Sequence, residues 1–253
     1  MINFLRITNK IKIGDYLHSD GNIDDRISSD IVGICVIPSD FLPDGYARFI
    51  ASDETADSWS NDYLPINRIS SYRDIIPGEE GTLRSGAILD LDSPFESDII
   101  LSPFLSDGKF NPLFHKELLD GNALQDYKGY ETAKNLCEWY STPIKSNQLN
   151  FSYGAPLDCI RFSPSPEFEK NSWYLPAIGE LIFLAYNYDQ IQERLRKIIK
   201  VCPNCICKTL KKSYYWSSTE EEDLYSWEVD LDFGYVDTCT KQDVNYVRPF
   251  CIR

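Results

Sequence analysis

The segment SWEVDLDF, at residues 226–233, alternates polar with large apolar side chains. The two sets are Trp227, Val229, Leu231 and Phe233, and between them Ser226, Glu228, Asp230 and Asp232. A period of two indicates a β-strand with one face in the core and the other in solvent. We therefore predict a strand whose buried face is apolar and whose exposed face is acidic.

The residues after this segment indicate further strands. Gly234 permits a turn into YVDTCT at 235–240, and NYVRPFCIR at 245–253 is typical of a closing strand. Pro249 lacks the backbone N–H that a central strand needs, so we expect this strand at a sheet edge or with a bulge.

The N-terminal part of the chain predicts a hairpin. The continuous apolar run in DIVGICVIPSD, at 30–40, is typical of a buried strand. The turn sequence Pro-Asp-Gly at 43–45 then leads into a second apolar segment at 46–51. The segment from about 52 to 129 has poor periodicity but several aromatic residues, so we expect an ordered, loop-rich insertion within a single domain, 1–253.

Two helices are expected between the strand regions. GYETAKNLCEWYSTP at 129–143 has apolar residues at helical spacing and ends at a proline. The segment at 175–203 has a longer apolar stripe that is interrupted near Asn187. Strands, then helices, then strands indicate an α+β fold.

The composition excludes several classes of function. The 253 residues include 39 acidic and 25 basic ones, a net charge of −14, which argues against a nucleic-acid or anionic-membrane partner. The sequence has no apolar run long enough for a membrane span and no secretory signal, so synthesis in the cytoplasm without a signal peptide is expected.

The eight cysteines and the acidic run at 220–223 are candidates for metal sites. Cys202, Cys205 and Cys207 supply half of a zinc site, but no second half is evident, and loop or core positions explain these thiols more simply. We expect mostly reduced thiols. The acidic run could bind calcium, although a solvated loop is the simpler interpretation. No cofactor is predicted.

Six blocks, taken in their order and spacing, resemble a known family. They are GDYLHSDG, GYETAKNLCEWY, WYLPAIGEL, YYWSSTE, WEVDLDFGYV and YVRPF, which begin at residues 14, 129, 173, 214, 227 and 246. Together they are similar to the C-type-lectin-fold domains of gut-bacterial and phage proteins. That family is related to the variable proteins of diversity-generating retroelements and distantly to formylglycine-generating enzymes.

The resemblance implies that both ends of the chain meet in one antiparallel sheet with two flanking helices. It also implies that the C-terminal strands carry a variable, ligand-facing surface. The residues at the corresponding positions are Tyr225, Glu228, Asp230, Asp232, Tyr235, Asp237 and Tyr246. Carboxylates beside tyrosine rings suit hydroxyl-rich or basic ligands, whereas an ordinary solvated sheet face is the plain alternative.

We therefore expect a non-enzymatic binding protein that recognises a bacterial surface glycan or protein. The absence of a signal peptide favours a virion tail or fibre protein over a bacterial surface component. A structural virion subunit that binds only other virion proteins, and forms a homo-oligomer, is the first alternative. A formylglycine-generating-like oxidase is the second, and it would have to use Cys239 and Cys251, around which the motif does not match.

Overall fold

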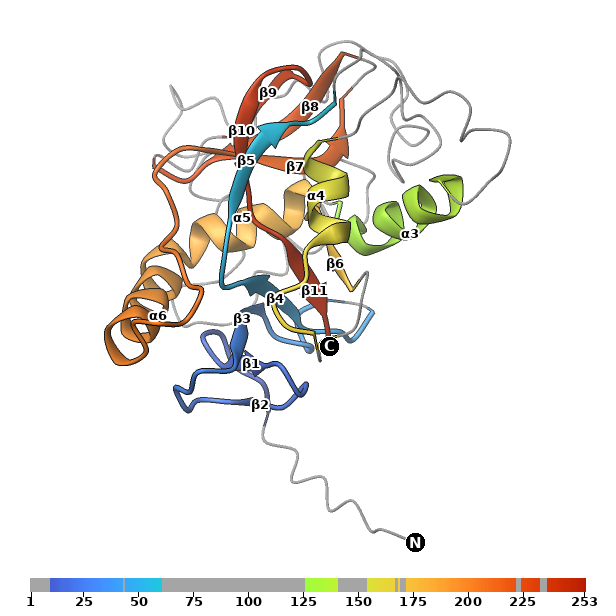
Figure 1. Cartoon of the computed structure of the whole chain (residues 1–253). Coiled ribbons are helices and arrows are strands. Elements are labelled where there is room, and N and C mark those ends of the chain that lie inside the picture. The colour runs from blue at the N-terminus through green and yellow to red at the C-terminus, as the bar shows by residue number, and fades with distance from the viewer. Residues whose placement is uncertain are drawn as a thin grey trace, which may run out of the picture.

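The computed structural model describes residues 10–42, 44–60, 126–140, 154–166, 168, 172–221, 224–232 and 236–253. These residues form two β-sheets with a helix between them (Figure 1). The α+β prediction is confirmed. The assignment to the C-type-lectin type stays a prediction, as does the division into one domain with an insertion.

The first sheet has six strands in the order β2-β1-β3-β4-β11-β6, and every neighbouring pair is antiparallel. Its strands are β2 (Ile23–Asp24), β1 (Tyr16–His18), β3 (Ile31–Ile37), β4 (Arg48–Ala51), β11 (Phe250–Ile252) and β6 (Trp173–Tyr174). The predicted N-terminal hairpin is the β3–β4 pair. Because β4 pairs with β11, the two ends of the described chain meet in one sheet, as expected.

The second sheet has five strands in the order β5-β10-β7-β8-β9. They are β5 (Thr55–Ser58), β10 (Val244–Val247), β7 (Tyr214–Glu220), β8 (Tyr225–Asp230) and β9 (Val236–Thr240). All its pairs are antiparallel except β10 with β7, which is parallel. Strand β5 lies inside the segment predicted to be an insertion, so that segment contributes an edge strand to the C-terminal sheet. Residues 61–125 lie outside the described part.

The C-terminal segment predicted as one closing strand is in fact two strands in different sheets. Strand β10 ends at Val247, and β11 begins at Phe250. Arg248 and Pro249 carry the chain from one sheet to the other, because proline ends the hydrogen-bond ladder of β10. Pro249 therefore marks a change of sheet, and β11 is an interior strand between β4 and β6.

Four helices are described: α3 (Gly129–Tyr140), α4 (Ala155–Arg161), α5 (Ile178–Tyr186) and α6 (Tyr188–Val201). The two predicted helices are α3 and the α5–α6 pair, and the predicted interruption falls at Asn187. The side-chain amide of Asn187 donates to the Phe183 carbonyl at 2.8 Å and so satisfies the end of α5. Helix α4 was not predicted.

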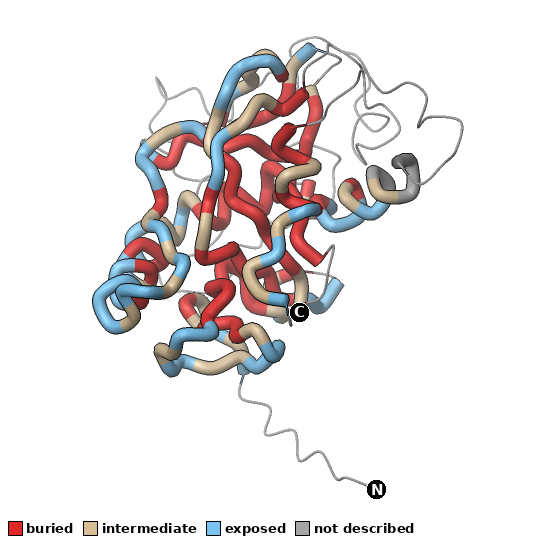
Figure 2. The backbone as a smooth tube through the Cα atoms, viewed as in Figure 1, coloured by how far each residue is buried: buried red, intermediate tan, exposed pale blue. Residues whose placement is uncertain are grey.

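Helix α5 lies between the sheets and is buried along its first seven residues (Figures 1 and 2). One apolar cluster joins it to both sheets through residues such as Ile34, Leu181 and Val229. The Glu180 carboxylate, which is fully buried, accepts from the Arg48 guanidinium at 2.7 Å and from the Tyr174 hydroxyl at 2.8 Å. This network ties α5 to β4 and β6 of the first sheet.

Candidate functional site

The predicted binding residues do not all lie on one face of the five-stranded sheet. Glu228 pairs in register with Asp237 of β9, and Asp230 lies two residues further along β8, so these three share a face. Tyr225 alternates to the opposite face, which packs on α5. Tyr246 also lies on that face, where its ring centroid is 5.6 Å from that of Tyr215.

The predicted exposure of β8 is wrong. Glu228 is 5% exposed and Asp230 is 4% exposed, so the strand is buried on both faces. The second face is covered because a smaller apolar cluster with Trp59, Trp216 and Val247 packs there. Alternation indicates which side chains share a face, but it cannot reveal a second core.

The remaining predicted positions lie at the rim or outside the described residues. Asp237 is exposed on β9. Asp232 is exposed beyond the end of β8 and forms an ion pair with the Lys212 ammonium at 2.7 Å. Tyr235 falls outside the described residues.

We name the side of this sheet that carries Glu228 the acidic face. Its members, as the structure brings them together, are Tyr214, Glu228, Asp230, Asp237, Cys239, Asp243 and Asn245. Glu228 accepts a hydrogen bond from the Asn245 amide, and the Cys239 thiol contacts an Asp243 carboxylate oxygen at 3.1 Å. The face thus has a buried carboxylate at its base and exposed carboxylates around it.

The electrostatics of the acidic face are unusual at Glu228. Burial, opposed by the Asn245 hydrogen bond and reinforced by the charge of Asp237, raises the pKa of Glu228 to about 7. Burial and the neighbouring carboxylates also raise the pKa of Tyr214, which is 37% exposed. Perturbed pKa values cluster at functional sites, so the acidic face is a candidate of this kind.

Sequence reasoning missed Tyr214, Asp243 and Asn245. Tyr214 is at the start of YYWSSTE, where alternation with Trp216 places both on one face of β7. Asn245 has no signal of its own, because its place depends on how β10 inserts between β5 and β7. Only the strand order, which the sequence does not give, brings Asn245 to Glu228.

Of the cysteines that were candidates for a zinc site or for oxidase chemistry, one pair is joined in a disulfide and another pair lies in different sheets. Cys202 and Cys205 form a disulfide, so they are not thiolate ligands for zinc and not reduced thiols, while the other six cysteines are free. Cys239 is on β9 and the buried Cys251 is on β11, in different sheets, which does not favour the oxidase alternative.

The acidic run at 220–223 is only partly a solvated loop. Glu220 is buried, and its carboxylate forms an ion pair with the buried Lys241 at 2.5 Å. Among the described residues, no group of three or more His, Cys, Asp or Glu side chains is arranged to hold a metal ion. Every helix in the described ranges is too short or too polar to cross a bilayer.

The chain is similar to a curated protein and to a solved structure. No family model matches the chain. A protein of Bacteroides ovatus ATCC 8483 named "Putative fimbrium tip subunit Fim1C" is 24% identical over an alignment 243 residues long, and the match covers 86% of this chain and 40% of that protein. The crystal structure of a fimbrial protein from the same strain is 15% identical, with a TM-score of 0.42, and covers 95% of this chain and 48% of its own. The chain therefore spans less than half the length of either protein.

Proposed function

We propose that this chain is a non-enzymatic recognition domain of a cell-surface appendage subunit and that it binds its ligand through the acidic face. The observation that carries the proposal is the similarity to a fimbrium tip subunit over 86% of the chain. A subunit at the tip of a fimbrium is in a position to meet surfaces outside the cell. The Cys202–Cys205 disulfide supports this location, because disulfides persist mainly in oxidising compartments.

The acidic face suits a hydroxyl-rich or cationic ligand. Asp237 and Asp243 are exposed and can accept hydrogen bonds from hydroxyl or ammonium groups. The ring of Tyr214 adds apolar contact area at low entropy cost. Because β8 beneath these residues is buried on both sides, their backbone is held rigidly, which lowers the cost of ordering the site on binding.

The comparisons favour the bacterial-surface alternative over the virion. Nothing in them points to a phage tail or fibre, and that location stays a sequence-based prediction. A role limited to assembly, in which the acidic face docks on a neighbouring subunit or a second copy of the chain, is the outcome to distinguish by experiment.

The test removes charge from the acidic face while retaining side-chain shape. The variant is Asp237→Asn with Asp243→Asn, and the matched control is Asp189→Asn with Glu193→Gln on the exposed side of α6. Wild type, variant and control are applied to an array of glycans and of immobilised bacterial and host surface proteins, and circular dichroism checks that each is folded. The control loses the same formal charge, so a non-specific charge effect weakens both.

We expect the variant to bind at least about tenfold more weakly than wild type and the control to bind as wild type does, since one hydrogen bond to a charged group contributes about 1.5–3 kcal/mol. Equal binding by variant and wild type would exclude the acidic face as the site. Self-association of the wild type that the variant loses, without binding to the array, would favour the assembly role.

A further inference from the structure

A pocket of about 460 Å³ lies on the first sheet, beside the Cys202–Cys205 disulfide and away from the strands that carry the acidic face. Its walls come from five parts of the chain: Ser19, the segment from Ser29 to Val32, Ser52 with Asp53, the segment 162–166 after α4, and the loop 204–206. Its volume is within the range of small-molecule sites. None of the seven residues of the acidic face lines it.

The lining of the pocket is rich in oxygen atoms. Five serines line it, at positions 19, 29, 52, 163 and 165, and Asp30 and Asp53 contribute carboxylates. None of the described residues that line it is Lys or Arg. Because anionic ligands are recognised mainly by Arg, Lys and helix N-termini, the chemistry argues against a phosphate, a sulfate or an acidic sugar.

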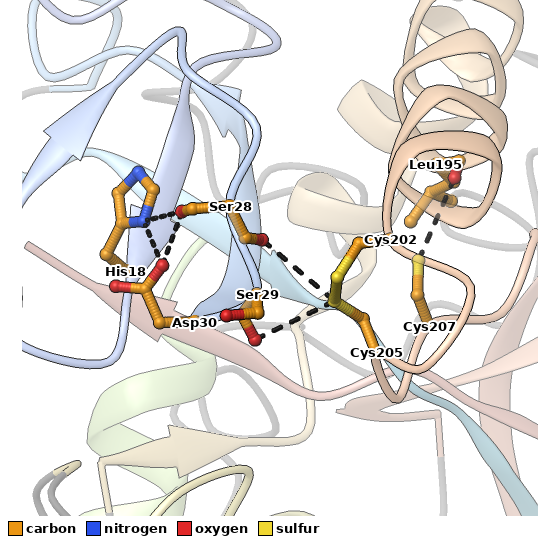
Figure 3. The surroundings of a disulfide bond; sticks show 8 residues. All are labelled: His18, Ser28, Ser29, Asp30, Leu195, Cys202, Cys205 and Cys207. Atoms are coloured by element: carbon orange, nitrogen blue, oxygen red, sulfur yellow. Dashed lines mark hydrogen bonds and ion pairs between the residues drawn. A yellow bond between two sulfur atoms is a disulfide. The ribbon is translucent and has the colours of Figure 1, made fainter.

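The two carboxylates of the pocket are already paired with groups behind or beside them. The Lys208 ammonium lies 2.8 Å from the Asp53 carboxylate. Asp30 accepts a hydrogen bond from the Ser28 hydroxyl and lies 3.1 Å from the ring nitrogen Nδ1 of His18 (Figure 3). Because the two carboxylates already have partners within the protein, they do not require a cationic ligand. The hydroxyl groups and acceptor oxygens of the pocket are then left to bind a neutral ligand.

An apolar surface completes the lining. Phe162 lines the pocket and is fixed edge-to-face against Trp173, with ring centroids 5.3 Å apart. Val32 is buried beneath, and Ile206, which is 70% exposed, is at the rim. Hydroxyl and carboxylate groups around an apolar patch match the hydroxyl groups and C–H faces of a sugar ring.

The disulfide holds one wall of this pocket in place. Cys202 follows the end of α6, and its backbone N–H donates to the Ile198 carbonyl at 2.8 Å. The bond to Cys205 closes a short loop on that helix, and the Cys205 sulfur contacts the Ser29 carbonyl oxygen at 3.7 Å (Figure 3). The rim of the pocket that carries Asn204 and Ile206 is thereby fixed between α6 and Ser29.

We infer that this pocket is a second binding site, specific for neutral, hydroxyl-rich ligands of the carbohydrate class, and that the Cys202–Cys205 disulfide positions its rim. The inference stands independently of the proposed function, because it concerns a different sheet and different residues. It predicts that changes in the pocket and on the acidic face have separable effects on binding.

The experiment starts from an array of neutral glycans built from hexoses, N-acetylhexosamines and fucose, with sialylated and sulfated glycans and immobilised spermidine beside them. The neutral glycan that gives the strongest signal is then titrated by calorimetry. Ser163→Trp fills the pocket from an exposed loop position, and Glu193→Trp adds the same side chain to the exposed side of α6 as a control. The charge variant Asp237→Asn with Asp243→Asn tests independence from the acidic face.

We expect Ser163→Trp to weaken binding of the neutral glycan at least tenfold, while Glu193→Trp and the charge variant bind as wild type does. Equal binding by Ser163→Trp and wild type, absence of binding to any neutral glycan, or preference for acidic glycans or spermidine would overturn the inference.

The role of the disulfide has its own test. Cys202→Ser with Cys205→Ser is expected to weaken glycan binding several-fold, because the rim must then be ordered on binding. Retention of circular dichroism and of the melting temperature to within a few degrees separates loss of the rim from loss of the fold. Unchanged affinity in this double variant would refute the positioning role.

Discussion

Replacing Glu228 by glutamine should make the protein more stable at alkaline pH and leave its stability at mildly acidic pH nearly unchanged. Glutamine retains an oxygen that can accept from the Asn245 amide, so the change removes a titratable group with little change of shape. In the wild type, burial raises the pKa of Glu228 from its ordinary value of 4.5 to about 7. The folded state therefore holds this proton more tightly than the unfolded chain does.

The direction and size of the effect follow from proton linkage. An acid whose pKa is raised on folding does not affect the free energy of unfolding when the pH is below its pKa in the unfolded chain. As the pH rises from that value to the pKa in the folded state, the acid lowers the free energy of unfolding progressively. Between pH 4.5 and 7 the loss is at most about 3 kcal/mol, because one pKa unit corresponds to about 1.4 kcal/mol. Above pH 7 the loss is constant.

Urea unfolding of wild type and Glu228→Gln from pH 5 to pH 8.5 measures this difference. We expect nearly equal free energies of unfolding at pH 5, and a variant that is more stable by up to about 3 kcal/mol at pH 8, or several degrees in melting temperature. If the difference between the two proteins stays constant over this range, Glu228 is not a buried, titrating carboxylate and the electrostatic account of the acidic face is incorrect.

Three further changes test the fold. Glu180→Ala leaves the buried Arg48 without its buried carboxylate partner and should cost about 3–5 kcal/mol in chemical denaturation, whereas a cost below about 1 kcal/mol would contradict the network. Gly154→Ala should destabilise by about 1–3 kcal/mol, because a Cβ there would lie 2.1 Å from the Ser58 carbonyl oxygen, and a neutral result in the same assay would refute that contact. Asp126→Asn should stabilise the protein above pH 7, since burial raises the pKa of Asp126 to about 7, and it should not do so at pH 4.

Much of the fold could be predicted because its strongest signals are local. The apolar run of β3, the turn before β4 and the stripe interrupted at Asn187 each report on a few neighbouring residues, and each appears in the structure. Helix α4 is only seven residues long, so it has too few turns for a periodic pattern. The switch of sheets at Pro249 had a local signal, but the partners of each half depend on residues far away in the chain.

The candidate site was less predictable because burial is a property of the tertiary structure. Alternation in β8 correctly grouped Glu228 with Asp230, yet it assigned them to solvent, because a charged residue is rarely buried unless it is paired or hydrogen-bonded. The compensating groups came from elsewhere: Asn245 from β10 for Glu228, and the backbone N–H of Asp232 for Asp230. The pocket on the other sheet had no sequence signal, since the alternating serines and prolines after Phe162 look like an ordinary loop.

The two candidate surfaces have different relations to the core, and this difference bears on how each could change. The acidic face has exposed carboxylates over a strand whose own polar residues are buried, so substitutions at Asp237 alter charge with little effect on packing, whereas substitutions at Glu228 alter stability as well. The pocket depends on loops, and one of its walls is fixed covalently by the disulfide. Buried ion pairs such as Arg48 with Glu180 and Lys241 with Glu220 join segments far apart in the sequence, and removal of one partner is costly. Exposed side chains over a core held in this way can be replaced without moving the backbone, whereas the walls of the pocket are themselves loops whose position depends on their residues. We therefore expect the acidic face to tolerate substitution better than the pocket does.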